Sequence, residues 1–223
     1  MAVKISGTFP KLLYRGFDQE EYAYSFLKEG SFLMRTLSYY KNTEDPKRRD
    51  EDEGKGRYDY WMEDRPAIWT DKESGQILSQ GINPGPVDFH TQSLNPCYIL
   101  CFYGPEVRLD YIASRNRPYV VRINDPGKLV RHIASYLNGC SNLSDEMWLI
   151  CVKVRYDKNQ YVNRLPEPAS EERLAMSYGQ KHPTDASDNE YRLVLTLPVT
   201  TENLHTEIEV KLGRLEKAEL IKL

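Results

Sequence analysis

The chain has 223 residues, of which 40% are hydrophobic and 28% are charged, and its formal net charge at pH 7 is −3. The length suits one substantial core and no linker divides it, so we predict a single domain over residues 1–223. The small excess of acidic residues argues against a surface devoted to neutralising nucleic-acid phosphates. No apolar run approaches the ~20 residues of a membrane span, so no membrane partner is expected.

The cysteines and histidines show no metal-binding pattern. The four cysteines include no CxxC pair, and the four histidines are scattered without metal-ligand spacing, so we expect no metal site. The start of the chain lacks the apolar core of a signal peptide. We therefore expect reduced thiols and a cytoplasmic location.

The first elements read as strand, helix and strand. Residues 11–15 resemble a short strand that Gly16 ends. Asp18 is a good N-cap, because an acid follows three residues later as in a capping box, and Gly30 is a natural C-terminal stop. Residues 31–35 are expected to form the next strand.

A charged run follows, in which ten of the thirteen residues from 44 to 56 carry a charge. Such a run is usually a solvated loop. Its signs are mixed, however, and the alternative is a folded turn in which Arg48, Asp50 or Glu53 braces Arg15 or a ligand. In that case the loop is ordered and at least one of its acids pairs with an arginine.

The rest of the chain is rich in predicted strands, and we expect an α+β fold in which strands dominate and helices are few. Asp125 followed by proline predicts a helix that begins there and runs to about Leu137. A short helix is possible over 170–176. Strands are expected at 58–62, 67–70, 76–78, 96–103, 118–123, 148–156, 191–197, 207–212 and 218–223, the one at 96–103 being central because it is almost wholly apolar.

Two acids open the late strand at 191–197. On an extended chain, Asp188 and Glu190 point to one face and Tyr191 to the other. The plain interpretation is that Glu190 pairs with Arg192 or is solvated at the strand end. The alternative is that Glu190 meets a ligand there, with a basic residue of the first strand opposite.

Four short motifs occur in order along the chain. They are Leu13-Tyr14-Arg15-Gly16, Ser38-Tyr39-Tyr40, Arg48-x-Asp50-x-x-Glu53-Gly54 and Asp188-x-Glu190-Tyr191-Arg192. In this order they resemble the ADP-ribosyltransferase family, and in particular small bacterial proteins, some of them associated with toxin–antitoxin or phage-defence loci. The chain departs from the family in two ways that bear on the acceptor: no Ser-Thr-Ser follows the second strand, and Asp188 stands where arginine-modifying members have a glutamate.

The resemblance implies an ADP-ribosyltransferase-like mixed sheet and a reaction that moves ADP-ribose from NAD to a macromolecular acceptor, protein or nucleic acid. An antitoxin is a further implied partner. The implied NAD-binding residues are Tyr14, Arg15, Gly16 and Tyr39, and the implied catalytic residues are Glu190 and Tyr40. Arg15 would hold the phosphates of NAD, and the carboxylate of Glu190 would stabilise the cationic ribose. We expect Arg15 and Glu190 to face one cleft from strands that lie close in one sheet.

Each implied role has a plainer alternative. Arg15 would otherwise pair with an acid of the charged run, and Tyr39 and Tyr40 would be ordinary structural aromatics. If these alternatives hold, the chain is a non-catalytic binding or sensor protein on the same fold. A nucleic-acid-processing enzyme ranks below both, because the chain is acidic and lacks a metal motif.

Overall fold

The computed structural model describes residues 3–36, 39–40, 66–70, 77–82, 97–140, 147–154, 156, 181, 183–197 and 206–223. Its strands are β1 (Lys4–Gly7), β2 (Leu13–Phe17), β3 (Ser31–Thr36), β4 (Pro66–Thr70), β5 (Ile77–Ile82), β6 (Cys97–Tyr103), β7 (Tyr119–Ile123), β8 (Trp148–Lys153), β9 (Glu190–Thr196), β10 (Glu207–Lys211) and β11 (Ala218–Lys222). Its helices are α1 (Glu20–Glu29), α3 (Leu109–Ser114), α4 (Pro126–Gly139) and the 3-10 helix η1 (Pro183–Asp188). The described part of the chain is therefore a mixed α+β structure in which strands dominate, as predicted.

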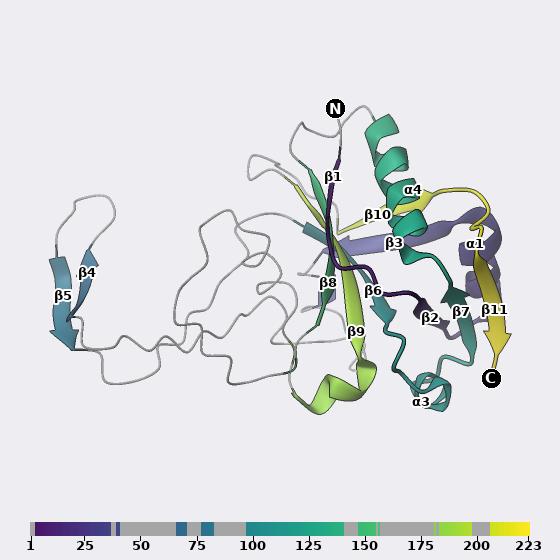
Figure 1. The fold of residues 1–223 in the computed structure, drawn as a ribbon, viewed down its shortest axis with the longest axis horizontal. Helices are drawn as coiled ribbons and strands as arrows, with labels where there is room; N and C mark the ends of the chain where they lie inside the picture. The colour runs from purple at the N-terminus through teal and green to yellow at the C-terminus, as the bar shows by residue number, and fades with distance from the viewer. Residues whose placement is uncertain are drawn as a thin grey trace.

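A nine-stranded sheet organises these elements (Figure 1). Seven strands follow the order β1-β8-β9-β6-β2-β7-β11, while β3 joins β6 and carries β10 on its other side. The pairing is antiparallel throughout this sheet except between β1 and β8. All residues of β9 and all but one of β6 are buried, so these two strands lie in the interior of the sheet. β4 and β5 pair with each other in a separate antiparallel sheet.

β6 shares one of its edges between two neighbours. Near one end Tyr103 pairs with Tyr14 of β2, and near the other end β6 pairs with Arg35 and Thr36 of β3. Within the described register, residues 100–102 have no strand partner on that edge. β2 and β3 therefore diverge from β6, and we call the opening between them the strand gap.

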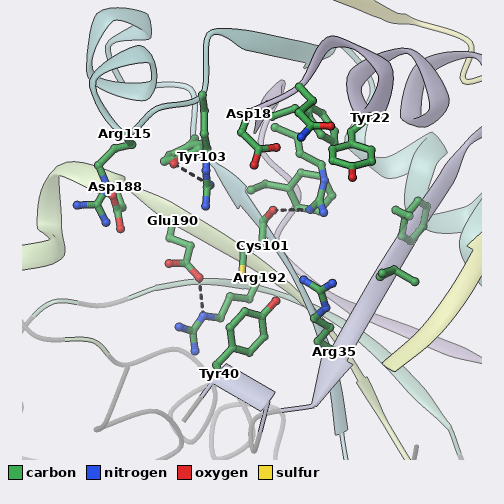
Figure 2. A pocket seen from close by; sticks show the side chains of 18 of the residues that line it. Asp18, Tyr22, Arg35, Tyr40, Cys101, Tyr103, Arg115, Asp188, Glu190 and Arg192 are labelled. Carbon is green, nitrogen blue, oxygen red and sulfur yellow. Dashed lines mark hydrogen bonds and ion pairs between the residues drawn. The ribbon is translucent and has the colours of Figure 1, made fainter. Parts of the chain in front are cut away.

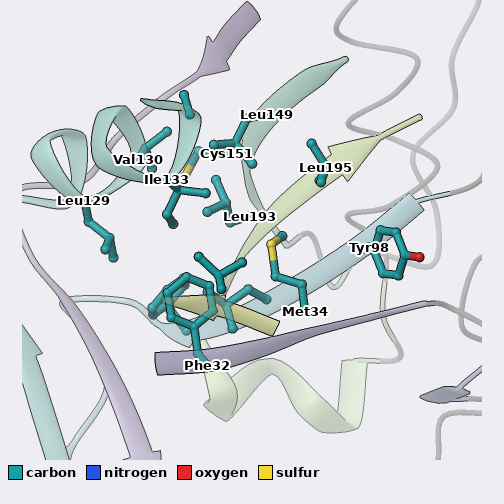
Figure 3. Packing of buried hydrophobic residues seen from close by; sticks show 14 of the residues in the cluster. Phe32, Met34, Tyr98, Leu129, Val130, Ile133, Leu149, Cys151, Leu193 and Leu195 are labelled. Atoms are coloured by element: carbon teal, nitrogen blue, oxygen red, sulfur yellow. The ribbon is translucent and has the colours of Figure 1, made fainter. Parts of the chain in front are cut away.

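Side chains alternate between the two faces of the sheet, as the two-residue period of a strand requires. On one face, Tyr191, Leu193 and Leu195 of β9 enter the main hydrophobic core. Helix α1 contributes Phe26 to this core. Helix α4 contributes Ile133, which Figure 3 shows beside Leu193.

The opposite face carries two smaller clusters. Val194 of β9 and Ile99 of β6 belong to one of them, and Tyr103 packs with Ile112 of α3 in the other. Glu190 and Arg192 lie on the same face as Val194, because each is separated from it by an even number of residues. The charged end of β9 thus lies on the side away from α1 and α4.

Two helix boundaries follow the local sequence as predicted, and one does not. Asp125 caps α4 by accepting a hydrogen bond from the backbone N–H of Lys128 at 2.9 Å, and α1 ends at Gly30, which is left-handed with φ 58°. Both features were predicted. The predicted N-cap at Asp18 is wrong by one residue, because β2 extends to Phe17 and α1 begins only after Gln19.

Three other expectations need correction or remain outside the described residues. Gly16 does not end the first strand but lies inside β2, and β1 and α3 were not predicted at all. The charged run 44–56, the predicted strand 58–62 and the possible helix 170–176 lie outside the described residues. Among the helices that are described, none has the length and apolar character needed to cross a membrane.

Candidate functional site

A cavity of about 720 Å³ lies at the strand gap and is lined from β2, α1, β3, β6 and β9 (Figure 2). This volume lies in the range of small-molecule binding sites. Its charged lining residues are six cations, Arg15, Arg35, Arg115, Arg117, Lys181 and Arg192, and four acids, Asp18, Asp188, Glu190 and Glu209. The excess of cations favours a ligand that carries negative charge.

Arg15 extends from β2 into the strand gap. Its Nη1 donates a hydrogen bond to the backbone carbonyl of Cys101 at 2.9 Å, on the stretch of β6 that lacks a described strand partner. Its Cζ lies 5.5 Å from the ring centroids of Phe17 and Phe26 and 5.7 Å from that of Phe102. Three aromatic rings thus surround the guanidinium. Its hydrogen bond to Cys101 satisfies a backbone carbonyl on an edge of β6 where no strand pairing is described.

The charge of Arg15 is not matched by any acid among the described residues, since none forms an ion pair with it. Its Nε is buried and has no hydrogen-bond partner there either. Burial, together with the nearby cations Arg117 and Arg35, lowers the pKa of Arg15 to about 10. The side chain therefore stays charged at neutral pH and keeps unused donors, which suits an anionic ligand.

Glu190, the first residue of β9, is held by two cations. Its Oε1 accepts a hydrogen bond from Arg192 Nε at 2.7 Å, and its Oε2 lies 2.7 Å from Lys181 Nζ. Its backbone N–H donates to the hydroxyl of Tyr156 at 2.8 Å. The Glu190 side chain is only 7% exposed, so the predicted pairing with Arg192 exists, but in a buried position rather than at a solvated strand end.

These contacts fix the protonation of Glu190. Burial alone would raise the pKa of the carboxyl, but the charges and hydrogen bonds of Arg192 and Lys181 outweigh it and hold the pKa at about 2. Burial lowers the pKa of Lys181, yet Glu190 raises it by more, so the ammonium stays protonated. At neutral pH the cluster is therefore one carboxylate between two cations.

Tyr40 and Cys101 also line the cavity, and both keep their protons at neutral pH. Burial raises the pKa of the Tyr40 hydroxyl well above its usual range. Burial, reinforced by Glu190, raises the pKa of the Cys101 thiol to about 12. Neither group is therefore a nucleophile in this state, and Tyr40 is a hydrogen-bond donor.

Arg117 is a lining residue that the sequence did not reveal. It precedes β7, and its Nη1 donates a hydrogen bond to the Tyr103 hydroxyl at 3.0 Å. A Cβ placed on Gly16 would lie 3.0 Å from Cβ and Cδ of Arg117 and 2.8 Å from Cγ2 of Ile112. Gly16 is thus the residue that lets the stem of Arg117 lie against β2.

The structure brings together four of the six predicted site residues. Arg15, Gly16, Tyr40 and Glu190 line the cavity, and β2 and β9 belong to one sheet. Arg15 leaves β2 on the face that α1 covers, whereas Glu190 leaves β9 on the opposite face, so the two reach the cavity from opposite sides of the sheet. The roles expected of these residues stay predictions. The other two, Tyr14 and Tyr39, are not among the lining residues. Tyr14 packs against the cluster that contains Tyr103, and Tyr39 lies under the Arg35 guanidinium, 4.4 Å from ring centroid to Cζ.

Asp188 lines the cavity, but, contrary to the prediction, it does not lie on the same extended strand as Glu190. It ends η1, and Asn189, with φ 41°, separates it from β9, so the two acids do not lie on one extended strand. Asp188 accepts a hydrogen bond from the Tyr111 hydroxyl at 2.7 Å.

The cavity therefore combines the unused donors of Arg15 with the ionised carboxylate of Glu190. Among the described residues, no group of three or more histidine, cysteine or acidic side chains is placed to hold a metal ion. Comparisons of the chain with models of protein families, with curated proteins and with solved structures each found no match.

Proposed function

We propose that this cavity binds NAD and that the chain transfers ADP-ribose from it to a macromolecular acceptor. The observation that carries the proposal is that Arg15 and Glu190, from two strands on either side of β6, line the same cavity. A guanidinium with unused donors suits the phosphates of a dinucleotide, and an ionised carboxylate suits the cationic ribose. The motifs in the sequence supplied the same two residues.

In the proposed reaction the bond between the nicotinamide nitrogen and the ribose C1′ breaks, and its electron pair leaves with neutral nicotinamide. Positive charge develops on the ribose, where Glu190 stabilises it. A nucleophile of the acceptor then bonds to C1′ and releases its proton to the solvent. Arg192 and Lys181 contribute by keeping the carboxylate ionised and fixed in direction.

A second candidate function is a non-catalytic binding or sensor protein. One observation favours it: both oxygens of Glu190 already contact cations, so their charge is largely neutralised before any ligand arrives. In this case the same arginines recognise a nucleotide, and no bond in it is broken.

The test is to incubate the protein with NAD labelled in its adenylate part and with a cell lysate, and to measure label transfer and nicotinamide release. Glu190→Gln is nearly isosteric and removes the charge, and the loss of one preorganised electrostatic group typically costs about 10²–10³ in rate. Glu219→Gln is the matched control, because Glu219 is an exposed strand acid that pairs with Arg122 outside the cavity.

A double variant guards against misfolding as the cause of lost activity. Glu190→Gln alone leaves two buried cations, whereas Glu190→Gln with Lys181→Gln restores the net charge of the cluster. We expect the double variant to be folded and inactive. Normal turnover in a folded Glu190→Gln protein would contradict the catalytic role, and NAD binding without turnover in the wild type would favour the sensor.

A further inference from the structure

We propose that Arg15 and Arg117 form a single site for the diphosphate group of a nucleotide, with Gly16 seating the second arginine. We call these two residues the arginine pair. The inference rests on the proposed use of this cavity and adds to it the ligand group that is recognised, together with a binding residue, Arg117, that the motifs do not contain.

The arginine pair is attached to one strand at a fixed spacing. Arg15 donates to the carbonyl of Cys101 and Arg117 to the hydroxyl of Tyr103, both on β6, and Figure 2 draws these contacts as dashed lines. The two contacted residues are two positions apart on β6; one contact is made to a backbone carbonyl and the other to a side-chain hydroxyl. Each arginine uses one N–H in the contact described, out of the five that a guanidinium carries.

Both guanidinium groups are held by packing rather than by acids. Arg15 lies among three phenylalanine rings, and the Cζ of Arg117 lies 5.8 Å from the ring centroid of Tyr103. No acid among the described residues forms an ion pair with either member. By contrast, Arg35 pairs with Glu207 at 3.0 Å, although it lines the same cavity.

The position of Gly16 connects the two arginines. Gly16 follows Arg15 in β2 and pairs with Val120 of β7, and Arg117 enters β7 beside it. Any larger residue at position 16 would crowd the stem of Arg117, because even a Cβ there would lie 3.0 Å from it, which is closer than ordinary van der Waals contact. Arg117 therefore lies on the face of β2 opposite to the Arg15 side chain, and both arginines line the cavity.

Two neighbouring cations without described counter-ions favour a ligand with two adjacent negative groups. The two positive charges repel each other, so a polyanion that neutralises both is preferred to one that reaches only one. A single phosphate matches one guanidinium bidentately. Two adjacent phosphates match both, which selects a nucleoside diphosphate or dinucleotide over a nucleoside monophosphate.

Isothermal titration calorimetry with ADP, AMP and inorganic pyrophosphate tests the inference. We expect ADP to bind at least tenfold more tightly than AMP, and pyrophosphate to compete with ADP. Arg117→Gln and Arg15→Gln should each weaken ADP binding by about 10- to 100-fold, whereas Arg117→Lys should retain part of it. Arg122→Gln, which removes an arginine of β7 outside the cavity, is the matched control and should bind ADP normally.

Gly16→Ala provides a second test that leaves both arginines in the sequence. It should weaken ADP binding by displacing Arg117, with a far-ultraviolet circular dichroism spectrum like that of the wild type. Equal affinities for ADP and AMP, or ADP binding unchanged in a folded Arg117→Gln variant, would overturn the arginine pair.

The outcomes separate this inference from the proposed function. Tight ADP binding that depends on Arg117, without any NAD turnover, would support the arginine pair and refute the transferase. NAD turnover with an unchanged KM in Arg117→Gln would support the transferase and refute the arginine pair.

Discussion

The two faces of β9 are equally buried but differ in what fills them. All seven residues of the strand are buried, yet Leu193 and Leu195 enter the apolar core while Glu190 and Arg192 form an ion pair in the cavity wall. Burial therefore does not separate structural positions from candidate functional ones in this strand. The two kinds of position are separated by the face on which each side chain lies and by its charge.

The charged face is the more demanding of the two. Arg192 is 1% exposed, and a buried ion pair commonly contributes no more stability than apolar residues of the same size would. Val194, on the same face, shows that the strand accommodates an apolar side chain there. Burial of the strand therefore does not by itself require charge at Glu190 and Arg192; under the proposed function the charge serves the ligand of the cavity.

The largest effect is expected from breaking the charged face. Glu190→Gln removes the carboxylate that Arg192 and Lys181 both contact, and removal of one partner of a buried pair costs about 3–5 kcal/mol. Urea unfolding at pH 7 measures this. The Glu190→Gln/Lys181→Gln variant should recover a large part of the loss, and a single variant as stable as the wild type would show that the ion pairs are not formed in solution.

Breaking the apolar face should cost somewhat less and leave the cavity intact. Leu193 is 1% exposed, and Leu193→Ala should lower the free energy of unfolding by about 3 kcal/mol through lost burial and a residual void. Ile5→Ala on β1, where the side chain is 38% exposed, is the control and should change stability by less than about 0.5 kcal/mol. We expect unchanged ADP affinity in the folded Leu193→Ala protein; a parallel loss of both would show that the two faces are coupled.

Acid should act on the charged face alone. The folded-state pKa of Glu190 is depressed from 4.5 to about 2, so its contribution to stability is complete above pH 4.5 and is lost as the pH falls towards 2. Between pH 6 and pH 3 the free energy of unfolding should fall by about 2 kcal/mol through Glu190 alone. The measurement is the difference in pH dependence of unfolding between wild type and Glu190→Gln, which cancels the other carboxyls. Identical pH dependence in the two proteins would contradict the depressed pKa.

The smallest expected effect concerns the helix that covers the apolar face. Asp125→Ala removes the N-cap of α4 and should cost about 1 kcal/mol in thermal unfolding. Asp125→Asn retains a capping oxygen and should cost only a few tenths of a kcal/mol. If the two variants are equally destabilised, the charge of Asp125 rather than its cap contributes the stability.

The sequence predicted those elements whose cause is local. The apolar run of β6, the aspartate–proline start of α4 and the stop at Gly30 each depend on a few neighbouring residues, and the structure confirms all three. β1 was missed because its only described strand partner is β8, some 140 residues later in the chain. A polar four-residue strand carries no local signal of that pairing.

The candidate site divides in the same way. Arg15 and Glu190 were found because each belongs to a short motif at a strand. Arg117 and Lys181 were missed because their roles arise from tertiary contacts, with Gly16 in one case and with Glu190 in the other. The resemblance also implied roles for Tyr14 and Tyr39, but strand alternation and the Arg35 contact direct their side chains elsewhere.

The strand gap has a consequence for thiol chemistry. Cys101 lies at the gap, and a thiol with a pKa of about 12 is ionised to only ~10⁻⁵ at pH 7, so it reacts slowly with maleimides and iodoacetamide. Because Cys101 lines the cavity, a ligand bound there would cover the thiol, and its alkylation should slow further when the cavity is occupied.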